Sequence, residues 1–186
     1  LIGVIALGAV IIGGGLWLYS DLGAPSYEDL PIERRYDIAA ENRANRMSQV
    51  EAETKVTPTP PLQEPDPRHM ELLTQLREAL NERPDDLQGY KLLARNEAVV
   101  GNYREAYTAQ QEVIRIQGDA ATADDYADLA DMMILAAGGF VSPEAETALS
   151  KSLSRDPQNG PAIYYTGLMF AQTGRPDMTF RLWNGL

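Results

Sequence analysis

Apolar residues between positions 87 and 118 recur with the three- and four-residue spacing of an amphipathic helix. They form two runs, separated by Gly101 and Asn102. Glycine adopts a positive φ without strain, so this dipeptide suits a tight turn between antiparallel helices. The pattern predicts a helical pair whose apolar positions are Tyr90, Leu93 and Ala94, then Ala106, Val113 and Ile114.

The same order of residues returns twice further along the chain. The small residues Ala94, Ala130 and Gly167 mark equivalent positions at intervals of 36 and 37 residues, close to the tetratricopeptide period of about 34. A half-copy with Leu72, Leu76 and Leu80 precedes them. Each pair buries only part of its apolar face, so neighbouring pairs must stack to close a core. We therefore expect an all-α protein whose residues 68–186 form a tetratricopeptide-repeat solenoid, with an array that continues beyond residue 186.

The beginning of the chain has a different character, because residues 1–19 carry no charge. As a helix they would measure about 28 Å, close to the thickness of a bilayer's hydrocarbon core. Trp17 and Tyr19 stand where aromatic rings prefer the membrane interface. A secretory signal peptide is the alternative, but its apolar region would be shorter. We expect a transmembrane helix over residues 1–20. The acidic flank that follows places the repeats outside the cytoplasm, in a bacterial periplasm.

Two segments connect this span to the repeats. Residues 21–55 form a juxtamembrane segment, in which 32–53 reads as one helix made basic by Arg34, Arg35, Arg43 and Arg46. It could lie on acidic headgroups or on a partner helix, although a marginal, solvated helix is favoured because few of its face residues are large and apolar. Residues 56–67 contain five prolines and read as an extended linker.

Composition limits the chemistry that the chain can perform. The 186 residues have a net charge of −11, which argues against a nucleic-acid partner. There is no cysteine and a single histidine, His69. The acidic run from Asp119 to Asp131 lacks the pattern of a calcium-binding loop. We expect neither catalysis nor a cofactor or metal.

Stacked helical pairs form a groove lined by the first helix of each pair. Residues one step away from the predicted core should face this groove, which would be apolar along its floor and charged with both signs. The predicted peptide-binding residues are Gln88, Lys91, Arg95, Val99, Asp124, Ala127, Asp131, Ile134, Tyr164 and Leu168.

The order of these segments resembles the CcmI (CycH) family of cytochrome c maturation. The resemblance rests on LGAP at 22–25 and YEDLP at 27–31 directly after the apolar stretch, on Arg34 and Arg35, and on a helix ending before Pro84. Members have two membrane helices, so this span would be the second.

The resemblance implies a membrane-anchored periplasmic chaperone in the bacterial inner membrane. It would hold apocytochrome c by its C-terminal helix and deliver it to a haem-ligation complex with subunits of the CcmF and CcmH type. Two alternatives remain open: another membrane-tethered repeat scaffold, assembling an envelope or secretion complex, and an enzyme whose site lies in a part of the protein not included in this chain.

Overall fold

The computed structural model describes residues 2–23, 30–57 and 66–186, and in these ranges every regular element is a helix. The chain divides into two compact units, Leu1–Arg35 and Tyr36–Leu186. The predicted exit segment after the apolar stretch and the proline-rich linker fall largely on residues 24–29 and 58–65, which lie outside the described residues.

The first unit contains α1, Ile2–Leu22. Its apolar side chains are largely exposed, among them Val10, Ile11 and Trp17. Leu1 and the side chains of Ile2, Val4 and Ile5 are outside the described residues. Among the helices that the structure describes, none is both long and apolar enough to cross a bilayer. The structure thus has a helix at residues 2–22, where we expected one, whereas the expected membrane span is not confirmed.

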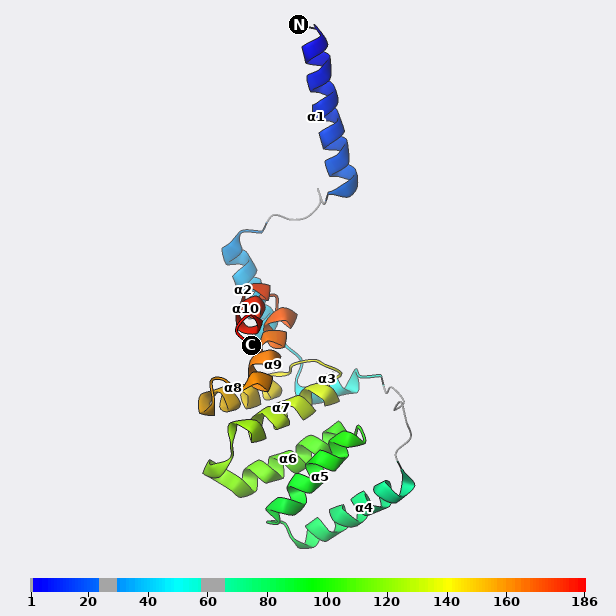
Figure 1. The fold of residues 1–186 in the computed structure, drawn as a ribbon, viewed down its shortest axis with the longest axis vertical. Helices are drawn as coiled ribbons and strands as arrows, with labels where there is room; N and C mark the ends of the chain where they lie inside the picture. The colour runs from blue at the N-terminus through cyan, green and yellow to red at the C-terminus, as the bar shows by residue number, and fades with distance from the viewer. Residues whose placement is uncertain (1, 24–29, 58–65) are drawn as a thin grey trace. The chain divides into compact units, whose positions relative to one another are not determined.

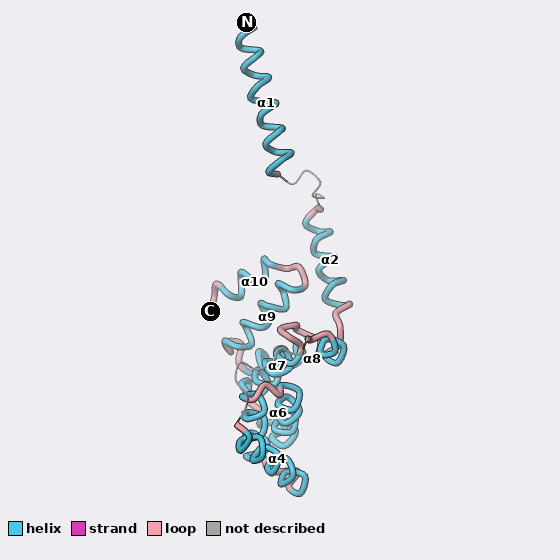
Figure 2. The backbone as a smooth tube through the Cα atoms, turned by 90° about the vertical axis from the view of Figure 1, so that its right-hand side faces the viewer, coloured by secondary structure: helices cyan, strands magenta, loops and turns pink. Residues whose placement is uncertain are grey.

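The second unit is built from stacked antiparallel helical pairs (Figure 1). A lone helix, α4 (Pro67–Glu82), packs on the first pair, α5 (Leu87–Val99) and α6 (Tyr103–Gln117). A short 3-10 turn, η1 (Gly118–Ala120), leads to the second pair, α7 (Ala123–Ala136) and α8 (Pro143–Arg155). The third pair is α9 (Gly160–Gln172) and α10 (Pro176–Trp183). Each helix packs on the next, and α7 also contacts α9, so the pairs follow one another along the stack (Figure 2).

Local signals in the sequence explain where these helices begin and end. The first helix of each pair has a side-chain cap, since Asp86, Thr122 and Asn159 each accept a hydrogen bond from a backbone N–H of the first turn. Gly101 and Gly174, with φ of 82° and 88°, form the turns within the first and third pairs.

The three small residues that mark the repeat lie in the interior, and at Gly167 the neighbouring helix approaches closely. Ala94 and Ala130 are 1% and 0% exposed. A Cβ added to Gly167 would lie 2.2 Å from Nε1 of Trp183 in α10, so the indole ring covers this glycine directly. The all-α fold is confirmed, and the stacked pairs agree with a helical-repeat solenoid.

The segment before the linker differs from the solvated helix that we expected. It forms two helices, α2 (Ile32–Ala44) and α3 (Gln49–Thr54), because Ser48 and Glu51 make a capping box that starts a new helix. Residues 36–57, which we name the docking segment, pack on the repeats instead of standing in solvent. Ala39, Gln49 and Ala52 are buried, and Arg43 and Arg46 form ion pairs with a carboxylate of the repeats.

The attachment of the docking segment is mainly polar. Arg43 and Arg46 both pair with Glu146 of α8, and Arg46 also donates to the carbonyl of Val141 at 2.9 Å. The Arg46 side chain is only 6% exposed. Near the start of the segment, the guanidinium of Arg175 lies 4.2 Å from the centre of the Tyr36 ring.

Candidate functional site

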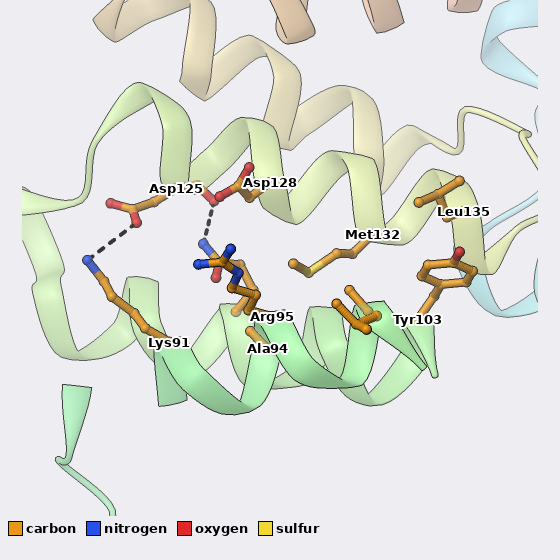
Figure 3. Close-up of a pocket in the computed structure, with 11 residues that line it drawn as sticks. Lys91, Ala94, Arg95, Tyr103, Asp125, Asp128, Met132 and Leu135 are labelled. Carbon is orange, nitrogen blue, oxygen red and sulfur yellow. Dashed lines mark hydrogen bonds and ion pairs between the residues drawn. The ribbon is translucent and has the colours of Figure 1, made fainter. Parts of the chain in front are cut away.

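A pocket of about 650 Å³ opens between the first two helical pairs (Figure 3). Its walls are the outer faces of α5 and α7, and the start of α6 contributes at one end. The lining residues are Lys91, Ala94, Arg95, Ala98, Val99, Tyr103, Gln110, Asp125, Asp128, Met132 and Leu135. We call this pocket the groove.

The wall made by α5 follows from the two faces of that helix. Leu93, Ala94 and Glu97 are buried toward the neighbouring helices. Residues one position further round the helix, Arg95 and Val99, are therefore left exposed. Val99 is 74% exposed, so its side chain is accessible to a ligand.

One end of the groove is charged. Lys91 Nζ lies 3.9 Å from Asp125 Oδ1. Partial burial alone would raise the pKa of Asp125, but hydrogen bonds from Thr122 and Gln117 outweigh it and hold that pKa below its ordinary value. Asp125 therefore stays ionised and forms an ion pair with Lys91.

Two further charges in the groove remain available. Partial desolvation, together with the nearby carboxylates of Asp124 and Asp131, raises the pKa of Asp128, so a bound cation would relieve the repulsion among these carboxylates and favour the ionised form. Arg95 is exposed, and in the described part of the chain it belongs to none of the ion pairs. A bound segment with charges of both signs could therefore pair with Arg95 and Asp128.

The other end of the groove is apolar. Tyr103 lies on the opposite side of this end from Met132 and Leu135 (Figure 3), and Ala98 and Val99 at the end of α5 also line the pocket. Behind the charged end lies Gln110, whose buried amide donates to the backbone carbonyl of Asp125 at 2.9 Å and so fastens α6 to α7. The groove thus offers an apolar anchoring end and a charged end within one opening.

The structure brings three of the ten predicted groove residues into this pocket: Lys91, Arg95 and Val99. Gln88 is exposed on α5 but does not line it. The prediction for Ala127 and Ile134 is corrected, because they are 2% and 1% exposed and belong to the core of α7. That helix contacts α6, α8 and α9, which leaves it only a narrow free face.

The remaining predicted residues lie nearer the third pair. Asp124 accepts a hydrogen bond of 2.7 Å from the amide of Asn159, and Asp131 accepts one from the Tyr165 hydroxyl. Tyr164 is half exposed and stacks on Trp183, with ring centroids 5.4 Å apart. Leu168 packs against the core. None of these four residues lines the pocket.

The sequence analysis missed Tyr103, Gln110, Asp125, Asp128 and Met132. Gln110 had a visible signal, because it is a polar residue at a position where the repeat pattern usually has an aromatic one. Glu97 carries the same signal: it is 0% exposed, and it binds Arg77 of α4 at 2.6 Å and the Asn102 amide at 2.9 Å.

The acidic run on α7 does not form a metal site. Among the residues that the structure describes, no three His, Cys, Asp or Glu side chains are grouped so that they could hold an ion. Its carboxylates instead serve the helix cap, the groove and the contact with the third pair.

The fold and the groove define a class: helical-repeat proteins with an open groove that is apolar at one end and charged at the other. Comparison with known proteins makes this more specific. No protein-family model matches the chain. It is 25% identical over 183 residues to the cytochrome c-type biogenesis protein CycH of Bradyrhizobium diazoefficiens, which covers 98% of this chain and 42% of the relative. It is 34% identical over 97 residues to the protein of the same name from Rhizobium meliloti, covering 52% of this chain and 24% of the relative.

The chain is therefore a homologue of the CcmI (CycH) proteins, and the resemblance noted in the sequence is confirmed. It spans less than half the length of these curated relatives.

Proposed function

We propose that this chain acts in cytochrome c-type biogenesis as a chaperone that binds apocytochrome c. The groove would hold the C-terminal helix of the client and present it to a haem-ligation complex with subunits of the CcmF and CcmH type. The observation that carries the proposal is the similarity to CycH over 98% of the chain. The aligned part of this chain includes every residue of the groove, but it corresponds to less than half of the relative.

The chemistry of the groove supports a helical client. An amphipathic helix could place an apolar side chain against Val99, Met132 and Leu135, which would contribute about 1.5–3 kcal/mol on full burial. Its charged side chains would meet Arg95 and Asp128, which set orientation and association rate more than affinity. Binding should therefore weaken only modestly with added salt.

We also propose a location, with residues 1–20 holding the protein at the bacterial inner membrane and the repeats in the periplasm. The uncharged stretch over residues 1–19 supports this, as do the exposed apolar side chains of α1. If the attachment is integral, the protein will stay in the membrane fraction after extraction at alkaline pH. Release into the soluble fraction would refute it.

The client proposal is tested by titrating the full chain with a peptide that corresponds to the C-terminal helix of an apocytochrome c. Val99→Asp should weaken binding about tenfold or more, because it puts a charge into the apolar end of the groove. Leu92→Asp is the matched control: Leu92 is 53% exposed on the same helix but does not line the groove. Equal affinity of the two variants would contradict the proposed site.

A second test compares the binding of unfolded apocytochrome c with the binding of folded, haem-loaded cytochrome c. Haem-loaded, folded cytochrome should bind less well than apocytochrome, because its C-terminal helix is already packed. Equal affinity for both forms would contradict a chaperone role. Capture from solubilised membranes then tests the partners: haem-ligation subunits support the proposal, and envelope or secretion machinery would favour the scaffold alternative instead.

A further inference from the structure

The short helix α3 of the docking segment contacts both helical pairs between which the groove opens: α6 of the first pair, and α7 and the start of α8 in the second. Two of its residues, Gln49 and Glu53, are one helical turn apart and are joined by a hydrogen bond of 2.8 Å from Gln49 Nε2 to Glu53 Oε1. Gln49 contacts α7 and the start of α8, and Glu53 contacts α6. The helix therefore bridges the first and second helical pairs.

Gln49 makes the contacts with the second pair. Its side-chain amide donates to the Met133 carbonyl at 2.7 Å, its side-chain oxygen accepts from the Ser142 hydroxyl at 2.7 Å, and its backbone N–H donates to Glu144 at 3.0 Å. Gln49 is 4% exposed and Ser142 is 0% exposed. Buried polar groups of this kind are costly to leave without partners, so the contact is specific.

Glu53 makes the contacts with the first pair. Its carboxylate accepts a hydrogen bond of 3.0 Å from the Tyr107 hydroxyl and forms an ion pair with Arg104, both in the first half of α6. Its side chain is only 5% exposed. Burial, and then the hydrogen bond to Glu53, raise the pKa of Tyr107 to about 12, so the phenol stays protonated and keeps donating.

These anchor points lie next to the apolar end of the groove. Arg104 follows the lining residue Tyr103 directly, and Met133 falls between the lining residues Met132 and Leu135. A displacement of either wall at this end would move the residues that we assign to anchoring the client.

We infer that α3 is a clip that sets the width of the groove, and that Gln49 and Glu53 are positioning residues for client binding. The role in binding rests on the proposed function; the effect on groove width does not. In a repeat array each pair contacts only its neighbours, so the angle between two pairs is determined by the single interface between them. The contacts of α3 connect the same two pairs at a second place, outside that interface, and so restrain this angle further.

Groove width can be measured directly because the chain contains no cysteine. Spin labels on cysteines introduced at Val99 and Leu135, on opposite walls, report the distance distribution across the opening in the full chain. The double change Gln49→Ala and Glu53→Ala should broaden this distribution and move it to longer distances. Val50→Ala is the matched control, since Val50 lies in the same helix with a side chain that is 62% exposed.

If the double variant keeps its helical content and its distance distribution coincides with that of Val50→Ala, α3 does not set the width of the groove. If the double variant loses helical content, Glu53→Gln decides in the same way, because it keeps an acceptor for Tyr107 but removes the charge that Arg104 requires.

Binding of the apocytochrome C-terminal peptide forms the second arm, with proteins that carry no spin labels. The clip variant should bind about fivefold more weakly or worse, the lower range of coupling between sites, while Val50→Ala binds as the wild type does. A widened groove with unchanged affinity would overturn the positioning role. If the wild type fails to bind the peptide, the proposed function fails, and the distance distribution alone then decides whether the clip sets groove width.

Discussion

Replacing Ala130 with a larger residue should lower the stability of the repeats by an amount that can be estimated from the structure. Ala130 is 0% exposed and lies in a core cluster with Met133, Val141 and Ala145. Replacing it with leucine adds three carbon atoms to a buried cluster in which α7 packs against α8 and α9. Alanine and leucine have similar helix propensities, so the cost arises from overpacking, at about 1–3 kcal/mol. For a compact unit of this size, that corresponds to a melting temperature lower by roughly 2–12 °C.

The assay is thermal unfolding of the full chain followed by far-ultraviolet circular dichroism. Ala171→Leu is the control, because Ala171 is exposed on α9, the equivalent helix of the next pair. It should leave the transition within about 2 °C of the wild type, since surface substitutions usually change stability little. If Ala130→Leu and Ala171→Leu unfold at the same temperature, Ala130 is not a close-packing point and the repeat register is wrong.

Three further outcomes are expected. Glu97→Ala removes the buried partner of Arg77 and should lower the free energy of unfolding by about 1–3 kcal/mol in a denaturant titration; Arg77 is 38% exposed and regains water, which limits the loss. Burial tends to raise the pKa of Glu146, but hydrogen bonds from its two arginine partners outweigh it and keep that pKa below 4.5. This contribution to stability is therefore present above pH 4.5 and disappears as the pH falls through the lowered pKa, so Glu146→Gln should flatten the acid side of the stability curve. A cysteine introduced at Thr57, which is exposed, should react with a membrane-impermeant thiol reagent in intact spheroplasts; labelling only after lysis would place the repeats in the cytoplasm.

The helical pairs were predictable because their signals are local and repeated. The three- and four-residue apolar spacing, the turn glycines and the interval between Ala94, Ala130 and Gly167 all appear within windows of a few tens of residues. Caps such as Thr122 and Asn159 reinforce the same boundaries. Where propensity, pattern and turn chemistry agree in this way, the local reading of a chain is dependable.

The docking segment could not be predicted in the same way. Its attachment consists of polar contacts between residues far apart in sequence, such as Arg46 with Glu146, which are 100 positions apart. Pairs of this kind leave no periodic pattern, and a basic stretch with few large apolar residues reads as solvated. The groove was predictable only in part for a related reason. On α5 one face is free, so Lys91, Arg95 and Val99 were found, whereas α7 is covered on several sides and buries Ile134.

If the groove binds an unfolded client as proposed, the docking segment gives a physical reason for holding the groove at a fixed width. A disordered segment that folds on binding loses conformational entropy, at a cost of about 2–5 kcal/mol or more. A groove that had to close around it would add its own ordering cost, and the complex would be weaker by the sum. Contacts with α6 through Glu53, with α7 through Gln49 and with α8 through Arg46 restrain these three helices before any client arrives. The restraint comes from residues outside the repeats, so the side chains that would meet a client under the proposed function could vary without changing the shape of the groove.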